Sequence, residues 1–354
     1  MPVPKKPNRK KLQALRKDME GSARAAHLQY VHDTDAGITR VRKGASFAYM
    51  EDGKKVTDEE TIQRIEAMVI PPAWEEVWIC ARANGHLQCT GKDAKGRKQY
   101  RYHAKWNALR NETKFTNMLA FAEALPKIRE TVAADLRLQG LPKTKVLAVA
   151  VSIMELTGIR VGNAEYEKIY GSFGLTTLRN RHLKQDAKGL RFEFKGKKGV
   201  SQSVPLKSKK LIRLVQRCKE LPGQALFQYL DDDGERHSID SGMVNSYIHE
   251  ISGGPFSAKD FRTWTGSLTA LKLLRGRNCA PSESAGKKAV LEVLDEVAAV
   301  LGNTRTVCKK YYVHPRLTNL YGTGELHLDC NGKVSEQPGL TTDESWLVAA
   351  LSRD

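Results

Sequence analysis

Two adjacent tyrosines lie in a cationic segment close to the end of the chain. Residues 301–315 read LGNTRTVCKKYYVHP, which places Tyr311 and Tyr312 directly after two lysines. A phenol has a pKa of about 10, so it attacks phosphate at neutral pH only where cations stabilise the phenolate and the charge on the phosphorus oxygens. A basic loop that carries a structural tyrosine pair explains this segment equally well. A catalytic tyrosine would therefore require further cations from elsewhere in the chain.

Two arginines meet this requirement. Arg160 lies in the sequence GIRVGN after an apolar helical stretch, and glycine lets a backbone or a phosphate approach closely. Arg262 lies near the start of another predicted helix. A guanidinium binds two phosphate oxygens at once and stays charged at neutral pH. Taken singly, each arginine is explained as well by an ion pair, of Arg160 with Glu155 or Glu165 and of Arg262 with Asp260.

A lysine lies on a basic, glycine-rich turn. Residues 189–204 alternate apolar and polar side chains around the sequence KGKKG, which predicts a β-hairpin inside a mostly helical region. Lys197 lies on this turn, where it can swing into a site and donate a proton if neighbouring cations lower its pKa. An exposed turn lysine is otherwise an ordinary surface charge.

A further cluster interleaves cations with aromatic side chains over residues 90–103, TGKDAKGRKQYRYH. Lys and Arg bind the phosphate backbone of DNA, and Gln, Tyr, Lys or Arg on a strand can enter the major groove. The residues expected to contact DNA are Lys92, Lys95, Arg97, Lys98, Gln99, Tyr100, Arg101 and Tyr102. The alternative is a solvated loop that leads to an edge strand.

Composition favours a nucleic-acid partner over a membrane. The chain has 354 residues, and 58 Lys and Arg against 40 Asp and Glu give a formal charge of +18. Such an excess favours a polyanionic partner. No apolar run reaches the length of about 18 residues that a membrane span needs, and no apolar region follows the basic residues at 1–17 as in a signal peptide. We therefore expect a cytoplasmic protein that binds no membrane.

The sequence offers no sign of a metal or a nucleotide cofactor. Its six cysteines are scattered without a CxxC pair, and no histidine pair has metal-ligand spacing. Walker-type and GxGxxG signatures are also missing. We expect reduced, mostly buried cysteines and no cofactor.

Hydrophobic periodicity divides the chain into three parts. We expect a basic arm at 1–35, a small β-rich DNA-binding N-domain at 36–107 and a mainly helical domain at 108–354. In the N-domain, strand patterns at 38–42 and 47–50, and at 77–80 and 86–89, predict two hairpins around a short helix at 58–68. Helical periodicity follows at 116–138, 145–170, 208–221, 259–274 and 284–301.

Taken together, these groups resemble the type IB DNA topoisomerases, in the compact poxvirus-like form found in bacteria. The resemblance covers nearly the whole chain. Its motifs are IPPAW at 70–74, VWIC at 77–80, GKDAKGRKQY at 91–100, GIRVGN at 158–163, FRTW at 261–264 and YVHP at 312–315. It implies an α+β fold in which a β-rich N-terminal domain precedes a mostly helical catalytic domain with a β-hairpin.

The resemblance also implies a role for each candidate residue. Tyr312 would attack a DNA phosphodiester and form a 3′-phosphotyrosyl link, while Tyr311 would pack or contact DNA. Arg160 and Arg262 would hold the non-bridging oxygens of the scissile phosphate, and Lys197 would protonate the leaving 5′ oxygen. The released strand would swivel before religation, so that supercoils relax without ATP or a metal ion.

One position departs from the family pattern. Asn303 lies nine residues before Tyr312, where many relatives carry a histidine that donates to a phosphate oxygen. A side-chain amide still donates a hydrogen bond but carries no charge, so a histidine-like titration should be missing from the pH dependence of the rate. Bacterial members often have Asn here, so the resemblance implies an active variant.

The expected partner is double-stranded DNA, held by a monomeric clamp in the nucleoid. A tyrosine site-specific recombinase is the nearest alternative, since it shares the catalytic fold and the Arg, Lys and Tyr set. Recombinases usually have a histidine three residues before the second arginine, where this chain has Lys259, and their N-domains are normally helical. A non-catalytic basic DNA-binding protein is a third possibility, because charge alone would suffice for binding.

Overall fold

The computed structural model describes most of the chain and divides it into two compact units, Met1–Asn117 and Met118–Asp354. The residues described are 19–352 without Ala45, Lys95, Arg97, Lys188, Cys279, Pro281 and 327–333, and the side chains of 110–114, 116 and 198 are also left aside. Two predicted DNA contacts, Lys95 and Arg97, and the first half of the basic arm therefore lie outside the described residues. The predicted boundary near residue 107 falls within helix α4 (Ala104–Asp135), which contributes to both units.

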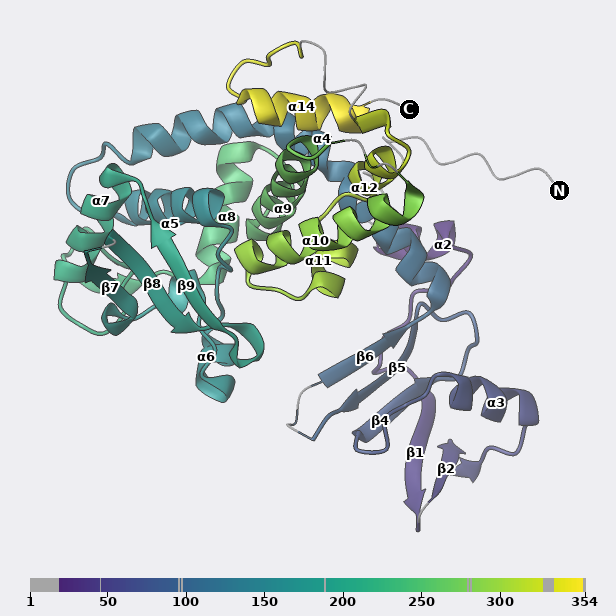
Figure 1. Ribbon diagram of the computed structural model, residues 1–354. Coiled ribbons are helices and arrows are strands. Elements are labelled where there is room, and N and C mark those ends of the chain that lie inside the picture. Colours follow the sequence, from purple (N-terminus) through teal and green to yellow (C-terminus); the bar gives the residue numbers. More distant parts are fainter. Residues whose placement is uncertain are drawn as a thin grey trace. The chain divides into compact units, whose positions relative to one another are not determined.

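The first unit is built on an antiparallel sheet of six strands (Figure 1). Along the sheet the order is β3-β2-β1-β4-β5-β6. The elements are α2 (Met19–Ala25), β1 (Gly37–Lys43), β2 (Ser46–Glu51), β3 (Lys54–Lys55), α3 (Glu59–Ala67), β4 (Glu75–Cys80), β5 (Leu87–Lys92) and β6 (Lys98–Tyr102). Both predicted hairpins are confirmed, as β1 pairs with β2 and β4 with β5. The two hairpins join through β1 and β4, a long-range pairing that no local pattern predicts.

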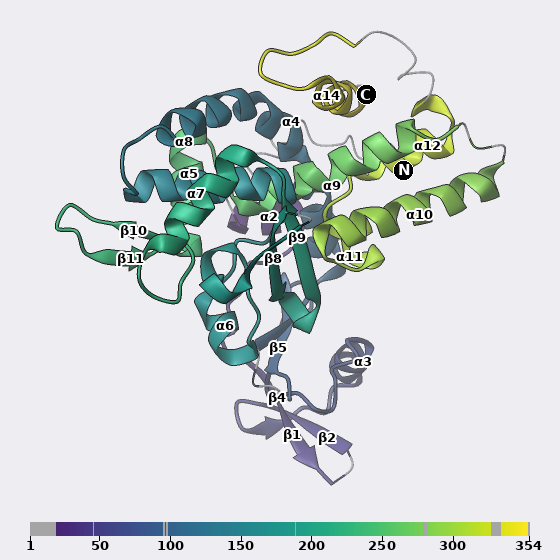
Figure 2. The ribbon, with the colours of Figure 1, turned by 60° about the vertical axis from the view of Figure 1, so that its left-hand side comes forward.

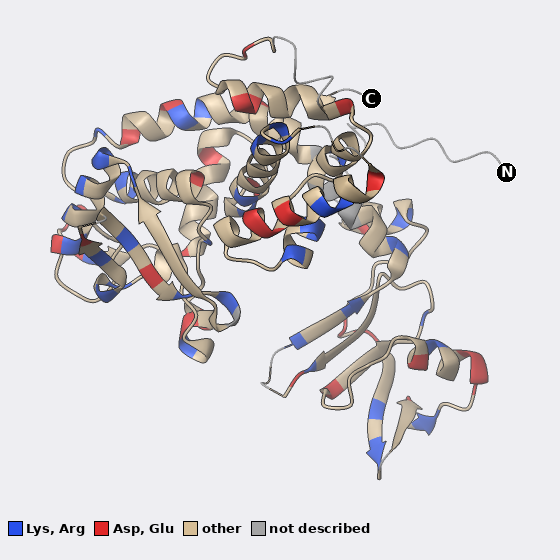
Figure 3. Ribbon diagram, viewed as in Figure 1, with Lys and Arg blue, Asp and Glu red and all other residues tan. Residues whose placement is uncertain are grey.

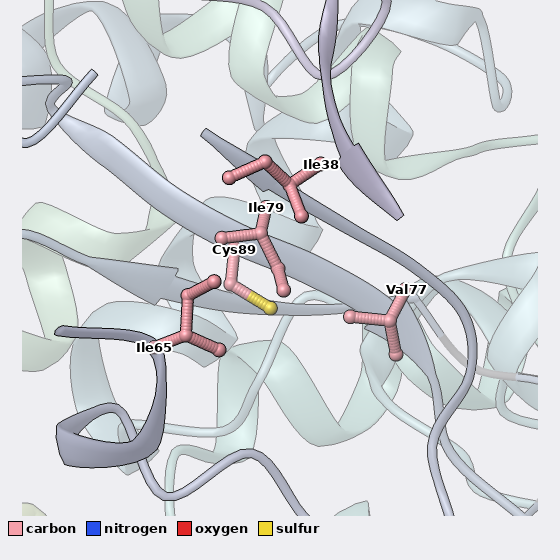
Figure 4. Packing of buried hydrophobic residues seen from close by; sticks show 5 residues of the cluster. All are labelled: Ile38, Ile65, Val77, Ile79 and Cys89. Carbon is pink, nitrogen blue, oxygen red and sulfur yellow. The ribbon is translucent and has the colours of Figure 1, made fainter. Parts of the chain in front are cut away.

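Helix α3 covers one face of this sheet. Asp58 caps the helix, since its carboxylate accepts a hydrogen bond of 2.8 Å from the Thr61 amide. The core between helix and sheet consists of side chains that are at most 4 % exposed (Figure 4). Its members are Ile38, Ile65, Val77, Ile79 and Cys89. Burial of this apolar set fixes the position of the strands that lead to β6.

The core of the first unit provides a test of the fold. Ile79→Ala removes a side chain with 0 % exposure and should lower the free energy of unfolding by about 2–5 kcal/mol. Val41→Ala, at a position of the same sheet that is 46 % exposed, should cost less than about 1 kcal/mol. Urea denaturation followed by tryptophan fluorescence measures both. Equal losses for the two variants would contradict the packing of β4 against α3.

The second unit is mostly helical, as predicted, and carries the expected β-hairpin. The helices after α4 are α5 (Lys143–Thr157), α6 (Ala164–Tyr170), α7 (Lys209–Glu220), α8 (Ser241–Ser252), α9 (Ala258–Arg275), α10 (Glu283–Leu301), α11 (Arg305–Tyr311), α12 (Pro315–Gly322) and α14 (Thr342–Ser352). The hairpin comprises β8 (Gly189–Lys195) and β9 (Ser201–Leu206), and β7 (Leu183–Asp186) extends it to three strands. A separate small hairpin pairs β10 (Gln228–Leu230) with β11 (Arg236–Ser238). Helices α9 and α10 run side by side in both views (Figures 1 and 2).

The helical stretch predicted at 145–170 is two helices and not one. Helix α5 ends at Gly158, which has a left-handed φ of 63°, and the chain runs through Gly162, with φ of 99°, before α6 begins. Glycine adopts these angles without steric cost, so it ends a helix although apolar periodicity continues beyond it. The break places Arg160 on an irregular segment between two helices.

No helix in the described part of the chain is both long enough and apolar enough to cross a membrane.

Candidate active site

The C-terminal ends of helices α5 and α10 meet at one arginine. Arg262 lies in the second turn of α9, and its side chain is only 4 % exposed. Its guanidinium donates to the carbonyl of Gly158, at the end of α5, and at 3.0 Å to the carbonyl of Leu301, at the end of α10. The last carbonyls of a helix lack internal partners and carry partial negative charge, so a cation stabilises both ends. These contacts hold the guanidinium in place.

The second arginine is fixed by the backbone on both sides of it. The carbonyl of Arg160 accepts a hydrogen bond of 2.8 Å from the Leu175 amide. Gly162 and Gly174 pack so closely that a Cβ on Gly174 would lie 2.5 Å from the Cα of Gly162. The Arg160 side chain donates at 3.1 Å to the carbonyl of Gly302 and also to the side-chain oxygen of Asn303. Both arginines therefore reach the end of α10.

The C-terminal cap of α10 positions Asn303. Gly302 adopts a left-handed φ of 58°, and the amide of Asn303 donates at 2.8 Å to the carbonyl of Ala298. This pattern is a common helix stop, and here it turns the asparagine side chain toward Arg160. The Asn303 Nδ2 group is buried and has no hydrogen-bond partner in the described part of the protein, and the same holds for Nε of Arg262.

Tyr312 joins this group, whereas Tyr311 does not. Tyr312 follows α11, and its ring centroid lies 4.9 Å from the guanidinium carbon of Arg262. Its carbonyl accepts a hydrogen bond of 3.0 Å from the Ser267 hydroxyl on α9, which holds the backbone in place. Tyr311 instead lies beside the ammonium of Lys310, 5.4 Å from its ring centroid. The structure thus brings Tyr312 together with Arg160, Arg262 and Asn303.

The site is positively charged and poorly solvated. Burial lowers the pKa of Arg160 to about 10, and the nearby charge of Arg262 acts in the same direction. Burial also raises the pKa of the Cys308 thiol to about 11, although both arginines oppose this shift. Among the described residues no carboxylate forms an ion pair with either arginine, and Glu155 pairs with Arg129 at 2.7 Å instead. A bound anion would relieve the repulsion between the two guanidinium groups.

Lys197 lies apart from these four residues. It is exposed on the short turn η3 (Lys197–Gly199) between β8 and β9, and within the described structure it has no hydrogen-bond or ion-pair partner. The hairpin nevertheless reaches the site through Gln202, whose amide occupies the space that a Cβ on Gly302 would need. Gln202 also lines a small cavity together with Arg160 and Arg262. The hairpin therefore borders the site, and its lysine is exposed to solvent.

Comparison with known proteins finds two related families and several relatives. The family described as eukaryotic DNA topoisomerase I, catalytic core, matches residues 103–322, and the bacterial DNA topoisomerase IB N-terminal domain matches residues 46–93. DNA topoisomerase 1B of Acanthamoeba polyphaga mimivirus is 30% identical over 80% of this chain and 87% of its own length. DNA topoisomerase 1B of vaccinia virus (strain Copenhagen) is 24% identical over 75% of this chain and 86% of its own length.

The chain belongs to the type IB DNA topoisomerases. Its function is accordingly that of an isomerase that acts on DNA. The match favours this topoisomerase function over the recombinase and the non-catalytic DNA-binding protein considered above.

The strand β6 of the topoisomerase presents an exposed aromatic pair. Tyr100 and Tyr102 are 47 % and 40 % exposed, and their rings stack with centroids 6.0 Å apart. The ammonium of Lys98 lies 5.8 Å from the Tyr100 ring centroid and pairs with Asp33. Basic residues lie along this strand and at the turn between β8 and β9 (Figure 3). The aromatic and cationic side chains thus alternate as the sequence predicts.

The other described members of this predicted DNA surface are held by local contacts. Lys92 pairs with Glu76 at 2.6 Å, Gln99 donates to Asp93 at 2.9 Å, and Arg101 donates to the carbonyl of Val69 at 3.2 Å. The exposed ion pair of Lys92 with Glu76 contributes little stability, so phosphate can replace this carboxylate at small cost. The role of these residues in DNA contact remains a prediction.

A groove beside the hairpin of β8 and β9 was not predicted from the sequence. It has a volume of about 1180 Å³ and lies between α6 and the strands β8 and β9. Lys168, Arg181 and Lys195 line it as exposed cations, and Phe173 forms part of its wall. Arg179 also lines the groove but pairs with Glu167 at 2.7 Å. The sequence signal for this groove is the cluster of basic residues at 179–184. Such a cluster alone is equally typical of a solvated surface.

Gly302 links the hairpin to the active site and can be tested there. Gly302→Ala places a Cβ where the Gln202 amide lies and also forces a left-handed alanine, which costs about 1–2 kcal/mol. We expect slower DNA cleavage together with lower thermal stability.

Gly253→Ala is the matched control, because Gly253 ends α8 with φ of 64° and its added Cβ would meet only Lys127, at 3.6 Å. It should lose similar stability and keep the cleavage rate. Single-turnover cleavage of labelled duplex DNA and thermal denaturation compare the two. Equal cleavage rates would show that Gln202 does not support the site.

Proposed function

We propose that Tyr312 attacks a phosphodiester of double-stranded DNA, forming a 3′-phosphotyrosyl bond and releasing a 5′-hydroxyl. The observation that supports this most directly is the position of its ring, whose centroid lies 4.9 Å from the guanidinium carbon of Arg262. The cation stabilises the phenolate that forms as the tyrosine loses its proton. The ring of Tyr311 lies instead beside the ammonium of Lys310, 5.4 Å from its centroid.

Arg160, Arg262 and Asn303 would bind the non-bridging oxygens of the scissile phosphate. In a buried, like-charged pair of arginines, an anion restores neutrality, and the benefit grows as negative charge develops in the transition state. The unpaired donors at Arg262 Nε and Asn303 Nδ2 support this role, since buried donors normally have partners. An amide at position 303 donates without titrating, so this position adds no ionisation to the pH dependence of cleavage.

Lys197 would protonate the 5′ oxygen as it leaves. The lysine lies on an exposed turn whose hairpin touches the site through Gln202, so movement of the turn on DNA binding would bring the ammonium to the leaving group. Without this proton an alkoxide would have to depart. In the reverse step the same lysine accepts the proton from the 5′-hydroxyl.

The phosphotyrosyl bond conserves the energy of the phosphodiester that it replaces. Attack by the free 5′-hydroxyl on this bond reseals the strand and regenerates the phenol, so atoms and charges balance without a nucleotide. Between the two steps the free strand rotates and supercoils relax. We infer that the cations of the protein provide the electrostatic stabilisation and that the cycle proceeds without ATP or a metal ion.

We further propose a monomer that works in the cytoplasm on the nucleoid of a bacterium. The match of residues 46–93 to a bacterial topoisomerase domain supports the bacterial origin. The formal charge of +18 supports binding to a long polyanion without a second subunit.

The nucleophile can be tested by trapping the adduct. Wild-type protein and Tyr311→Phe should form a covalent complex with duplex DNA after denaturation in detergent, whereas Tyr312→Phe should form none because it lacks the attacking oxygen. The complex is measured as labelled DNA that migrates with protein on a denaturing gel. Absence of an adduct from the wild type would exclude the covalent mechanism, and loss in Tyr311→Phe alone would assign the other tyrosine.

The general acid can be tested by changing the leaving group. Lys197→Ala should slow cleavage about 10²–10⁴-fold on ordinary DNA. Replacing the bridging 5′ oxygen by sulfur should restore the rate, since a thiolate leaves without a proton. Lys195→Ala, on the same hairpin, is the control and should respond little to either substrate. A deficit of Lys197→Ala that persists with the sulfur substrate would point to DNA binding as the role of this lysine.

A further inference from the structure

Helix α14 is buried along most of its length. Six of its eleven residues are at most 8 % exposed, namely Glu344, Ser345, Trp346, Leu347, Val348 and Ala350. The helix follows the residues 103–322 that match the topoisomerase catalytic core, and it packs against α9 and α12 (Figure 1). Among these buried side chains is a carboxylate, that of Glu344, which is 3 % exposed and which an apolar cover would not need.

Glu344 receives hydrogen bonds from several elements at once. Arg129 on α4 binds it in a bidentate manner, with Nη2 2.6 Å from Oε1 and Nη1 3.0 Å from Oε2. The indole nitrogen of Trp264 on α9 donates to Oε1 at 3.1 Å. The amide of Thr341 donates to Oε2 at 2.8 Å. Burial opposes ionisation, yet these hydrogen bonds lower the pKa of Glu344 to about 2.

The same arginine reaches the helix that precedes Arg160. Nε of Arg129 lies 2.7 Å from the carboxylate of Glu155, in the last turn of α5. Because α5 ends at Gly158, this ion pair fixes the segment from which Arg160 extends. Trp264 lies two residues after Arg262 on α9, so the hydrogen bond from its indole fixes the turn that carries the second arginine.

A third contact ties α14 to the chain that follows the nucleophile. Nε of Arg316 on α12 donates at 2.7 Å to the carbonyl of Ala350. Arg316 lies one turn beyond Tyr312 in sequence, after the cap formed by His314. Helix α14 therefore contacts α9, which carries Arg262, and α12, which follows Tyr312 in the chain. Through Arg129 it also reaches α5, which precedes Arg160.

We propose that α14 is a latch that positions these three residues relative to one another, with Glu344 and Arg129 as positioning residues. The inference rests on the function proposed above. A buried ion pair adds little net stability compared with apolar packing, but it defines one register between the elements that it joins. Displacement of a catalytic group by about 1 Å can slow a reaction about 10²-fold. The site therefore requires a fixed relative position of the elements that hold these three residues.

Glu344→Gln tests the latch, with Asp343→Asn as a matched control. The glutamine keeps an acceptor for Trp264 but removes the charge that binds Arg129. Asp343 is the neighbouring carboxylate, 37% exposed, and pairs with two cations of α9, Lys272 at 2.9 Å and Arg275 at 3.5 Å. Its variant therefore weakens ion pairs between the same two helices near the surface. Single-turnover cleavage of duplex DNA at saturating protein gives both the rate constant and the amplitude of the active fraction.

We expect Glu344→Gln to lower the cleavage rate constant about 10-fold or more, with unchanged affinity for DNA and unchanged amplitude. Asp343→Asn should stay within about twofold of the wild type. A purely structural role would lower the amplitude and the melting temperature and leave the rate constant of the active molecules unchanged, which would overturn the proposal.

Trp264→Phe provides a second test of the latch if the Glu344→Gln variant does not fold. It removes only the indole donor and keeps an aromatic ring beside Phe121. A lower rate constant with full amplitude supports the latch, and a rate equal to that of the wild type contradicts it. Failure of the proposed function is distinguishable, because the wild type would then form no covalent adduct with DNA at all.

Discussion

The site depends on a buried guanidinium at the meeting point of two helix ends. Arg262 satisfies carbonyls at the C-termini of α5 and α10 and stands beneath the ring of Tyr312. Each of these helix ends is negative, so the cation is stabilised without a carboxylate partner. A carboxylate would have neutralised the arginine, whereas backbone carbonyls leave its full charge available to a phosphate. The left-handed glycines Gly158 and Gly302 end these helices and so present their last carbonyls to the guanidinium.

The sequence predicted which residues could carry the chemistry better than it predicted how they are arranged in space. The fold class, both N-terminal hairpins, the β8–β9 hairpin and the five candidate catalytic residues came from local patterns and from the family resemblance. The structure brings four of those five together, and leaves Lys197 on a turn nearby. The basic run alone did not separate Tyr312 from Tyr311, because both follow the same lysines, and it was the YVHP motif of the family resemblance that selected Tyr312. In the structure the guanidinium of Arg262, distant in sequence, lies beside the ring of Tyr312.

The remaining differences have physical causes. Apolar periodicity continues beyond Gly158, so hydrophobic periodicity alone, which takes no account of backbone angles, did not predict the break between α5 and α6. Arg160 had two acidic neighbours in sequence, yet Glu155 turned out to pair with Arg129, which approaches from another helix. Helix α14 escaped prediction because it is buried nearly all round and shows no amphipathic stripe. Each difference involves contacts between residues that are far apart in the chain.

The burial of Cys308 bears on which atom the enzyme uses to attack. A thiol beside two arginines would normally ionise and compete with a phenol, since thiolates are strong nucleophiles. Here the side chain has 0 % exposure, and burial holds the pKa of its thiol at about 11. The sulfur stays protonated and out of reach of solutes, so the site retains an oxygen nucleophile only. Alkylating and oxidising reagents that inactivate thiol enzymes should therefore find little to react with beside Tyr312.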